Sequence, residues 1–126
     1  MVIFKSKTLL KQGLKVEVIS GKHKFILDEP VGLGGTDLGM NPVEALLGVL
    51  GACKCIVARS FAQAHNIDLQ DIRIDLEGKL DPKGYMGIKK DVKVGFSEIK
   101  SKVFIKSSSS DEDIVKFVEF IEKNCP

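Results

Sequence analysis

Three cysteines, Cys53, Cys55 and Cys125, are the residues of this 126-residue chain with the most distinctive chemistry. Cys53 and Cys55 lie two residues apart in a stretch that predicts a helix, so at about 100° per residue their side chains project to nearly opposite sides. Within an intact helix they can neither bond to each other nor share one metal ion. Because the number of cysteines is odd and only two histidines are present, buried or reactive thiols are favoured over a disulfide framework or a structural metal site.

A long apolar helix must position the first two cysteines. Asn41 can cap its N-terminus, Pro42 suits the first helical position, and Glu44 can complete a capping box. The pattern predicts that the helix continues to His65 or Asn66. Its middle contains almost no polar side chain, so it must be covered on most sides. We expect a second copy of the chain to provide part of that cover, in an obligate homodimer with a large interface.

Two stripes run along this predicted helix. The bulkier stripe carries Cys53 and is expected to face the core; it consists of Leu46, Val49, Leu50, Cys53, Ile56 and Val57. The other stripe is mostly small, allows another backbone to come close, and gives Cys55 a packing role; it consists of Ala45, Gly48, Ala52, Cys55, Arg59 and Ala62. Lys54, between the two cysteines, is expected to be solvated or to extend its ammonium group to solvent.

The glycine-rich loop from Gly32 to Gly39 precedes the helix. Its place between a strand and a helix invites comparison with phosphate-binding loops. However, Asp37 stands where a dinucleotide-binding fingerprint has glycine, and the Gly-Lys-Ser/Thr ending of a P-loop is missing. We therefore expect the glycines to allow a tight backbone path into the helix.

The remaining segments predict strands and one further helix. Phe25 to Leu27 belongs to a strand that pairs with an earlier one, and a second helix begins near Ser110 and ends at Cys125 on its buried face. The expected elements are one or two strands within 2–19, a turn at 20–23, a strand at 24–27, a strand at 72–78, a turn at 81–84, a loop at 85–94, a strand at 96–106 and the helix at 110–125. Together they predict a single α+β domain over residues 1–126, with a sheet on one side of the long helix.

The composition excludes several classes of function. Nineteen basic residues against seventeen acidic ones give a net charge of +2, and their interspersed arrangement provides no footprint for nucleic acid. No run of eighteen apolar residues predicts a membrane span, and no secretory leader is recognisable. We therefore expect a cytoplasmic protein with no bound cofactor.

The chain resembles the OsmC/Ohr family of osmotically inducible and organic-hydroperoxide-resistance proteins over essentially its whole length. The residues that carry the resemblance are Gly35-x-Asp37-x-Gly39-x-Asn41-Pro42, then Glu44-x-Leu46-Leu47-Gly48-x-Leu50-Gly51-Ala52-Cys53, and finally Asn124-Cys125-Pro126. The resemblance implies an intertwined homodimer with two sites at its interface. It also implies a peroxidase cycle in which Cys53 attacks an organic hydroperoxide, Cys125 resolves the sulfenic acid as a disulfide, and a dithiol such as dihydrolipoamide reduces the disulfide.

Two departures make the chain more similar to the broader OsmC-like branch than to typical Ohr proteins. The peroxidase branch has an arginine in an early loop, whereas Lys22, His23 and Lys24 occupy the comparable turn here. It also has a catalytic glutamate where this chain has Val43, and the nearest acid is Glu44. Since Cys53 lies too deep in its helix for the helix dipole to form a thiolate, a nearby cation is needed, and Lys22 and His23 are candidates.

Two functions from different classes follow. The first is a thiol-dependent peroxidase with Cys53 as nucleophile, Cys125 as resolving residue and Glu44, His23 or Lys22 as assisting groups. The second is a non-catalytic protein that binds a small hydrophobic molecule around Cys53 or senses redox state. Consumption of an organic hydroperoxide in the presence of a dithiol separates the two, because a binding protein consumes none.

Overall fold

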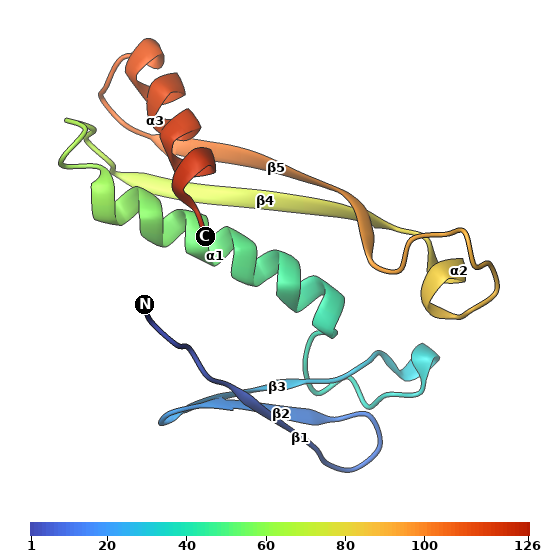
Figure 1. Ribbon diagram of the computed structural model, residues 1–126. Coiled ribbons are helices and arrows are strands. Elements are labelled where there is room, and N and C mark those ends of the chain that lie inside the picture. The colour runs from blue at the N-terminus through green and yellow to red at the C-terminus, as the bar shows by residue number, and fades with distance from the viewer. The chain divides into compact units, whose positions relative to one another are not determined.

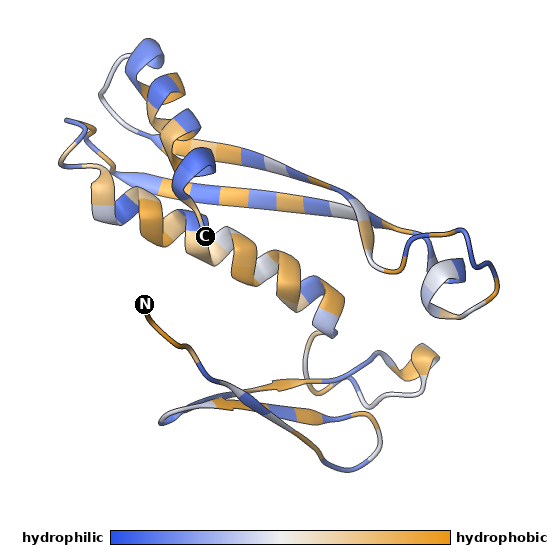
Figure 2. Cartoon of the chain, viewed as in Figure 1, coloured by the Kyte–Doolittle hydropathy of each residue, from blue (hydrophilic) through white to orange (hydrophobic).

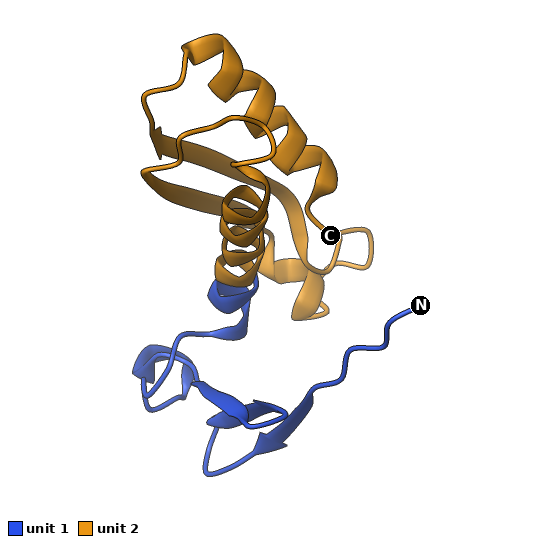
Figure 3. Cartoon of the chain, turned by 90° about the vertical axis from the view of Figure 1, so that its left-hand side faces the viewer, with its two compact units in different colours: residues 1–46 blue, residues 47–126 orange.

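The computed structural model describes residues 1–126 and shows a mixed α+β fold, as predicted (Figure 1). Two compact units are present, residues 1–46 and residues 47–126 (Figure 3). No helix has both the length and the apolar character needed to cross a membrane. The elements in chain order are β1 (Lys7–Leu10), β2 (Val16–Ser20), β3 (His23–Leu27), the 3-10 helix η1 (Val31–Leu33), α1 (Pro42–Phe61), β4 (Asp71–Leu80), α2 (Pro82–Tyr85), β5 (Phe96–Lys106) and α3 (Asp111–Asn124).

The first unit contains a three-stranded antiparallel sheet in the order β1-β2-β3. Ser20 pairs with His23, so Gly21 and Lys22 form a two-residue turn, and the predicted hairpin is confirmed. Gly21 has a φ of 57°, as the tight hairpin turns that match strand twist require. The prediction of one or two strands within residues 2–19 is confirmed by β1 and β2, although residues 2–4 belong to neither strand. Because β2 ends at Ser20 and its neighbour pairs only from Lys7 onward, the segment before Lys7 has no strand opposite it.

The loop that leads into α1 is built around the buried carboxylate of Asp28. Thr36 donates to this carboxylate through its hydroxyl at 2.5 Å and through its N–H at 3.3 Å, and the N–H groups of Glu29 and Leu38 donate at 2.8 and 3.3 Å. A Cβ on Gly35 would lie 2.0 Å from the Glu29 carbonyl oxygen. The glycine-permitted backbone path is therefore confirmed, and several N–H groups of the loop point inward at a protein carboxylate.

The second unit contains the two-stranded antiparallel ribbon β4–β5. Figure 2 shows hydrophilic and hydrophobic residues alternating along both strands. On the exposed face, opposite charges stand across from each other in the register, for example Asp75 with Lys102 and Glu77 with Lys100. Such cross-strand pairs stabilise a sheet, so the strands predicted around residues 72–78 and 96–106 are confirmed together with their alternation.

Helices α1 and α3 cover the other face of this ribbon. The core consists of Ala58, Ala62, Ile67, Leu69, Phe117 and Ile121, with inward-facing residues of both strands packed against it. Ser110 caps α3 as predicted, because its hydroxyl accepts the Asp113 N–H at 3.2 Å. The core is small for 126 residues, since many large apolar side chains remain exposed.

Two predictions about α1 are wrong. The helix ends at Phe61 rather than at His65 or Asn66, and the following turn closes with the Ile67 N–H bonded to the Ala62 carbonyl at 2.8 Å. The second error concerns which face is buried. The expected core residues Leu46, Val49 and Ile56 are 58%, 59% and 67% exposed.

The face of α1 that is buried carries Gly51, Lys54 and Ala58. A Cβ on Gly51 would lie 2.6 Å from the Leu76 side chain, so only glycine fits at this position against the ribbon. Hydrophobicity alone favours the bulky stripe, but the close approach of helix and ribbon buries a third face that belongs to neither predicted stripe.

Candidate functional site

Cys53 and Cys125 come together in the second unit. Cys53 lies on α1, Cys125 follows the last residue of α3, and both are partly buried free thiols. Burial raises the pKa of the Cys125 thiol, and interactions with the Cys53 side chain, through hydrogen bonding and charge, raise it further. Two free thiols carried by separate elements thus lie close enough for Cys53 to affect the pKa of Cys125.

A buried lysine lies beside this thiol pair. Lys54 is only 6% exposed, and its Nζ atom lies 2.8 Å from both carboxylate oxygens of Glu122 and 3.2 Å from the Ser101 hydroxyl. The Ser101 hydroxyl in turn donates to Glu122 at 3.3 Å. The expectation that Lys54 is solvated is wrong. A buried ammonium group requires an opposite charge and filled hydrogen bonds, and this cluster supplies both.

We call Lys54, Ser101 and Glu122 the Lys54 cluster. It joins three elements, because Lys54 lies on α1, Ser101 on β5 and Glu122 on α3. Lys54 is the residue after Cys53, and Glu122 is three residues before Cys125. Both charges act on the nearby thiol: Lys54 lowers the pKa of Cys125 and Glu122 raises it. The cluster is thus connected to the thiol pair through the backbone, and its charges act on the pKa of Cys125.

The other candidate residues lie elsewhere. Lys22 is exposed in the hairpin turn of the first unit, and His23 is exposed at the start of β3. Glu44 is exposed in the first turn of α1, where its N–H donates to the Asn41 side chain at 2.8 Å. Asn41 thus caps the helix, whereas no bond from the Glu44 carboxylate back to Asn41 completes the capping box. Cys55 is a free, partly buried thiol on α1. The structure thus brings together only Cys53 and Cys125 of the predicted site residues.

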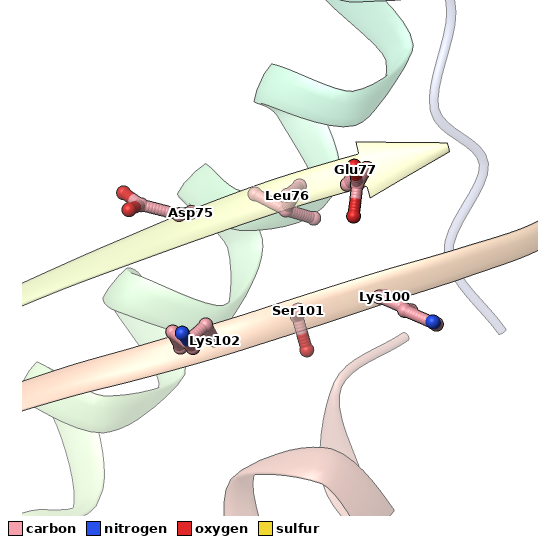
Figure 4. A pocket seen from close by; sticks show the side chains of 6 residues that line it. All are labelled: Asp75, Leu76, Glu77, Lys100, Ser101 and Lys102. Carbon is pink, nitrogen blue, oxygen red and sulfur yellow. The ribbon is translucent and has the colours of Figure 1, made fainter. Parts of the chain in front are cut away.

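A pocket of about 690 Å³ opens on the β4–β5 ribbon, and neither Cys53 nor Cys125 lines it. Figure 4 shows its lining, which comprises Asp75, Leu76 and Glu77 from β4 and Lys100, Ser101 and Lys102 from β5. It touches the Lys54 cluster through Ser101. No group of three or more His, Cys, Asp or Glu side chains forms a metal-binding arrangement.

Sequence reasoning missed the three members of the Lys54 cluster. One signal was available: Lys54 is the only charged residue between Glu44 and Arg59 in an otherwise apolar helix. A lone lysine in such a place is either exposed or paired, and the partners lie 47 and 68 residues further along the chain. Nothing in the local pattern identifies partners at that separation.

Comparisons with known proteins agree with this architecture. The profile of the OsmC-like protein family matches residues 34–126. A protein of Mycoplasma genitalium named hydroperoxide reductase is 32% identical over 91 residues, which are 70% of this chain and 59% of that protein. A hydroperoxide reductase of Mycoplasma pneumoniae is 30% identical over 121 residues, which are 94% of this chain and 79% of that protein.

Solved structures share the fold. The crystal structure of an OsmC-like protein from Mycoplasma pneumoniae has a TM-score of 0.85 and 25% identity, and the match covers 99% of this chain and 84% of that one. An organic hydroperoxide resistance protein from Legionella pneumophila has a TM-score of 0.70 at 21% identity, with 100% and 88% covered, which is a likeness of fold. The match to the family profile over most of the chain and the identity to the two mycoplasma proteins lead to one conclusion: the chain belongs to the family of OsmC-like proteins.

Proposed function

We propose that this protein is a thiol-dependent peroxidase that reduces organic hydroperoxides. The observation that carries the proposal is the placement of two free thiols, from α1 and from the end of α3, near each other and near the ion pair of the buried Lys54 with Glu122. The names of the two mycoplasma relatives support the same reaction class. We assign Cys53 as the nucleophile and Cys125 as the resolving residue.

The proposed cycle has three steps. The Cys53 thiolate attacks the hydroperoxide, a sulfur–oxygen bond forms, the oxygen–oxygen bond breaks, and the alcohol leaves after taking up a proton. The Cys125 sulfur then attacks Cys53, a disulfide forms, and the hydroxyl group leaves as water with the proton of Cys125. An external dithiol, of the dihydrolipoamide kind, reduces the disulfide by exchange and restores both thiols.

The experiment is consumption of tert-butyl hydroperoxide in the presence of dihydrolipoamide. Cys53→Ser should abolish consumption, whereas the matched Cys55→Ala variant should stay within a few-fold of the original rate. In the absence of the dithiol, Cys125→Ser should consume about one equivalent and accumulate sulfenic acid. No consumption by the unaltered protein would overturn the proposal and leave a non-catalytic protein that binds a small hydrophobic ligand or senses redox state. Loss of activity in Cys55→Ala alone would contradict the assignment of Cys53.

A cation for the Cys53 thiolate is part of the proposal, with Lys22 or His23 of one chain and the acid Glu44 as assisting groups by family position. Alkylation of Cys53 from pH 5 to 10, with the other two cysteines replaced, tests this idea. A lysine partner predicts a thiolate that stays reactive through neutral pH. A histidine partner predicts that reactivity falls as the imidazolium deprotonates, which partly offsets the usual rise with pH. One titration at or above about 8.5, the ordinary value for a thiol, would contradict activation by either group.

We further propose a homodimer that covers the exposed stripe of α1. Val49 and Ile56 are 59% and 67% exposed, and Cys53 lies between them on the same side of the helix. Sedimentation should give a dimer at micromolar concentration. Val49→Asp with Ile56→Asp should release monomers, whereas Val115→Asp, at a similarly exposed position on α3, should not. A folded monomer in the unaltered protein would refute this assembly.

A further inference from the structure

We propose that the Lys54 cluster positions Cys125 for attack on the sulfur of Cys53, so that Lys54 and Glu122 govern the resolving step rather than the attack on the hydroperoxide. The inference rests on the proposed function only for the source of the sulfenic acid. The cluster would control formation of the Cys53–Cys125 disulfide whichever oxidant acts on Cys53. Lys54 and Glu122 are positioning residues in this proposal, since neither becomes bonded to the reacting atoms.

The ammonium group of Lys54 is held in one place. It has three N–H donors, and the two carboxylate oxygens of Glu122 and the Ser101 hydroxyl give it three acceptors. Its side chain is 8% exposed, so water offers little alternative to these partners. A charge at this depth keeps its partners, because separation would leave it uncompensated. The distance between α1 and the last turn of α3 is therefore set at this point.

Glu122 is linked to the resolving thiol through the last turn of α3. Glu122 and Cys125 are three residues apart, which places them on neighbouring positions of one helix side. The Cys125 N–H still bonds to the Ile121 carbonyl at 3.0 Å, although Cys125 itself has extended backbone angles. The thiol is therefore held by the last hydrogen bond of the helix. Lys54 is next in sequence to Cys53, and Glu122 is near Cys125. The ion pair between Lys54 and Glu122 therefore fixes the position of one thiol relative to the other.

The two charges of the ion pair also act on Cys125. The groups that face Cys125 are Cys53 and Lys54 from α1 and Glu122 from α3. The positive charge favours the Cys125 thiolate and the negative charge disfavours it, so the two halves of the pair act in opposite directions. Removing Lys54 should raise the pKa of Cys125 further, and neutralising Glu122 should lower it. An ion pair that only holds the helices together, with its charges too far away to act on the thiol, predicts no such opposition.

The test follows one turnover after rapid mixing with one equivalent of tert-butyl hydroperoxide, in protein that carries Cys55→Ala. Lys54→Met should leave the rate of Cys53 oxidation within about threefold, slow disulfide formation by about tenfold or more, and let Cys53 sulfenic acid accumulate. Lys79→Met is the control, because Lys79 forms an ion pair with Glu98 at 3.3 Å on the exposed face of the ribbon, where neither charge is buried. This control should change neither step.

Two further measurements keep the proposal open to refutation. Lys54→Arg retains the charge and should recover part of the lost rate. In protein that lacks Cys53 and Cys55, alkylation of Cys125 should shift to higher pH with Lys54→Met and to lower pH with Glu122→Gln. Equal slowing of both chemical steps, an unchanged disulfide rate, or pH shifts in the same direction would each overturn the proposal.

Failure of the proposed function can be told apart from failure of this inference. Equilibration with reduced and oxidised glutathione forms the Cys53–Cys125 disulfide without any hydroperoxide. Lys54→Met should lower the disulfide equilibrium constant by about tenfold, and the Lys79→Met control should leave it unchanged. If the unaltered protein consumes no hydroperoxide, the peroxidase assignment fails, but the glutathione measurement still decides the role of the Lys54 cluster. An unchanged constant in Lys54→Met would overturn it.

Discussion

Asp28 and Lys54 are the two charged residues that the fold buries, with 1% and 6% of their surfaces exposed, and they find their partners in different ways. All donors to the Asp28 carboxylate come from residues within ten positions along the chain. The partners of the Lys54 ammonium lie 47 and 68 positions away. The first arrangement closes a loop, whereas the second joins a helix, a strand and another helix.

This difference shows what a buried charge can contribute in each case. The Asp28 carboxylate replaces missing backbone acceptors inside one loop, so its effect stays within residues 28–38. The Lys54 cluster fixes the spacing of elements that carry the two cysteines. We therefore expect changes around Asp28 to appear as lost stability, and changes around Lys54 to appear as altered thiol chemistry as well.

The largest effect should come from the loop around Asp28. A Cβ added at Gly35 would lie 2.0 Å from the Glu29 carbonyl oxygen, which is backbone and cannot move aside cheaply. Gly35→Ala should lower the free energy of unfolding by about 3 kcal/mol. Gly32→Ala is the matched control, since nothing lies within 4 Å of its position, and it should be neutral or slightly stabilising. Urea unfolding of both variants measures the difference. Equal stabilities would show that the tight backbone path around Asp28 does not depend on Gly35.

The next largest loss of stability should come from the Lys54–Glu122 ion pair, and it should differ between substitutions of its two members. Glu122→Ala leaves a buried ammonium with only Ser101 as a partner, so it should cost about 2 kcal/mol of unfolding free energy. Lys54→Met removes the buried charge and leaves Glu122, which is 45% exposed and can be hydrated, so it should cost less than about 1 kcal/mol. Thermal unfolding at one pH tests this order. If Lys54→Met loses more unfolding free energy than Glu122→Ala, the attraction within the ion pair contributes more to stability than burying the ammonium group costs.

The smallest effect should be the acid-sensitive part of the Asp28 contribution. The hydroxyl of Thr36 and the N–H of Glu29 hold the pKa of Asp28 at about 2, below its ordinary value of 3.8. Because the folded value is the lower one, this stabilisation is present above about pH 4 and disappears as the pH falls toward 2. Asp28→Asn should therefore be less stable than the unaltered protein at neutral pH and approach it in acid. Unfolding curves from pH 2 to 7 would contradict the idea if the difference stayed constant.

The same contrast explains how far the sequence predicts the structure. Ser110 caps α3, Gly21 turns the hairpin and the strand at Phe96–Lys106 alternates, and each of these signals lies within a few residues of its effect. The buried face of α1 could not be predicted in this way. Apolar periodicity favours Leu46, Val49 and Ile56, but Gly51 permits a closer approach to Leu76, and that contact depends on residues 25 positions apart.

The residues of the candidate site likewise fall into those that local sequence patterns identify and those that only the structure brings together. The likeness to a known family identifies Cys53 and Cys125 from residue patterns, and the structure places them as neighbours. Lys54, Ser101 and Glu122 form a site only because three elements meet, so no local pattern marks them. The end of α1 at Phe61 was also beyond prediction, because Ala62 to His65 are compatible with a helix and the turn at Asn66 depends on its positive φ of 57°.

The two-stranded ribbon β4–β5 has a further consequence for the exchange of backbone amide hydrogens with solvent. In an antiparallel pair, each strand directs its N–H groups alternately toward its partner and away from it. Because no third strand flanks either side of the ribbon, every second amide along both strands lacks an inter-strand bond. Deuterium uptake should therefore alternate residue by residue from Asp71 to Leu80, and a partner strand bound along either side would slow the fast half of that pattern while leaving the slow half unchanged.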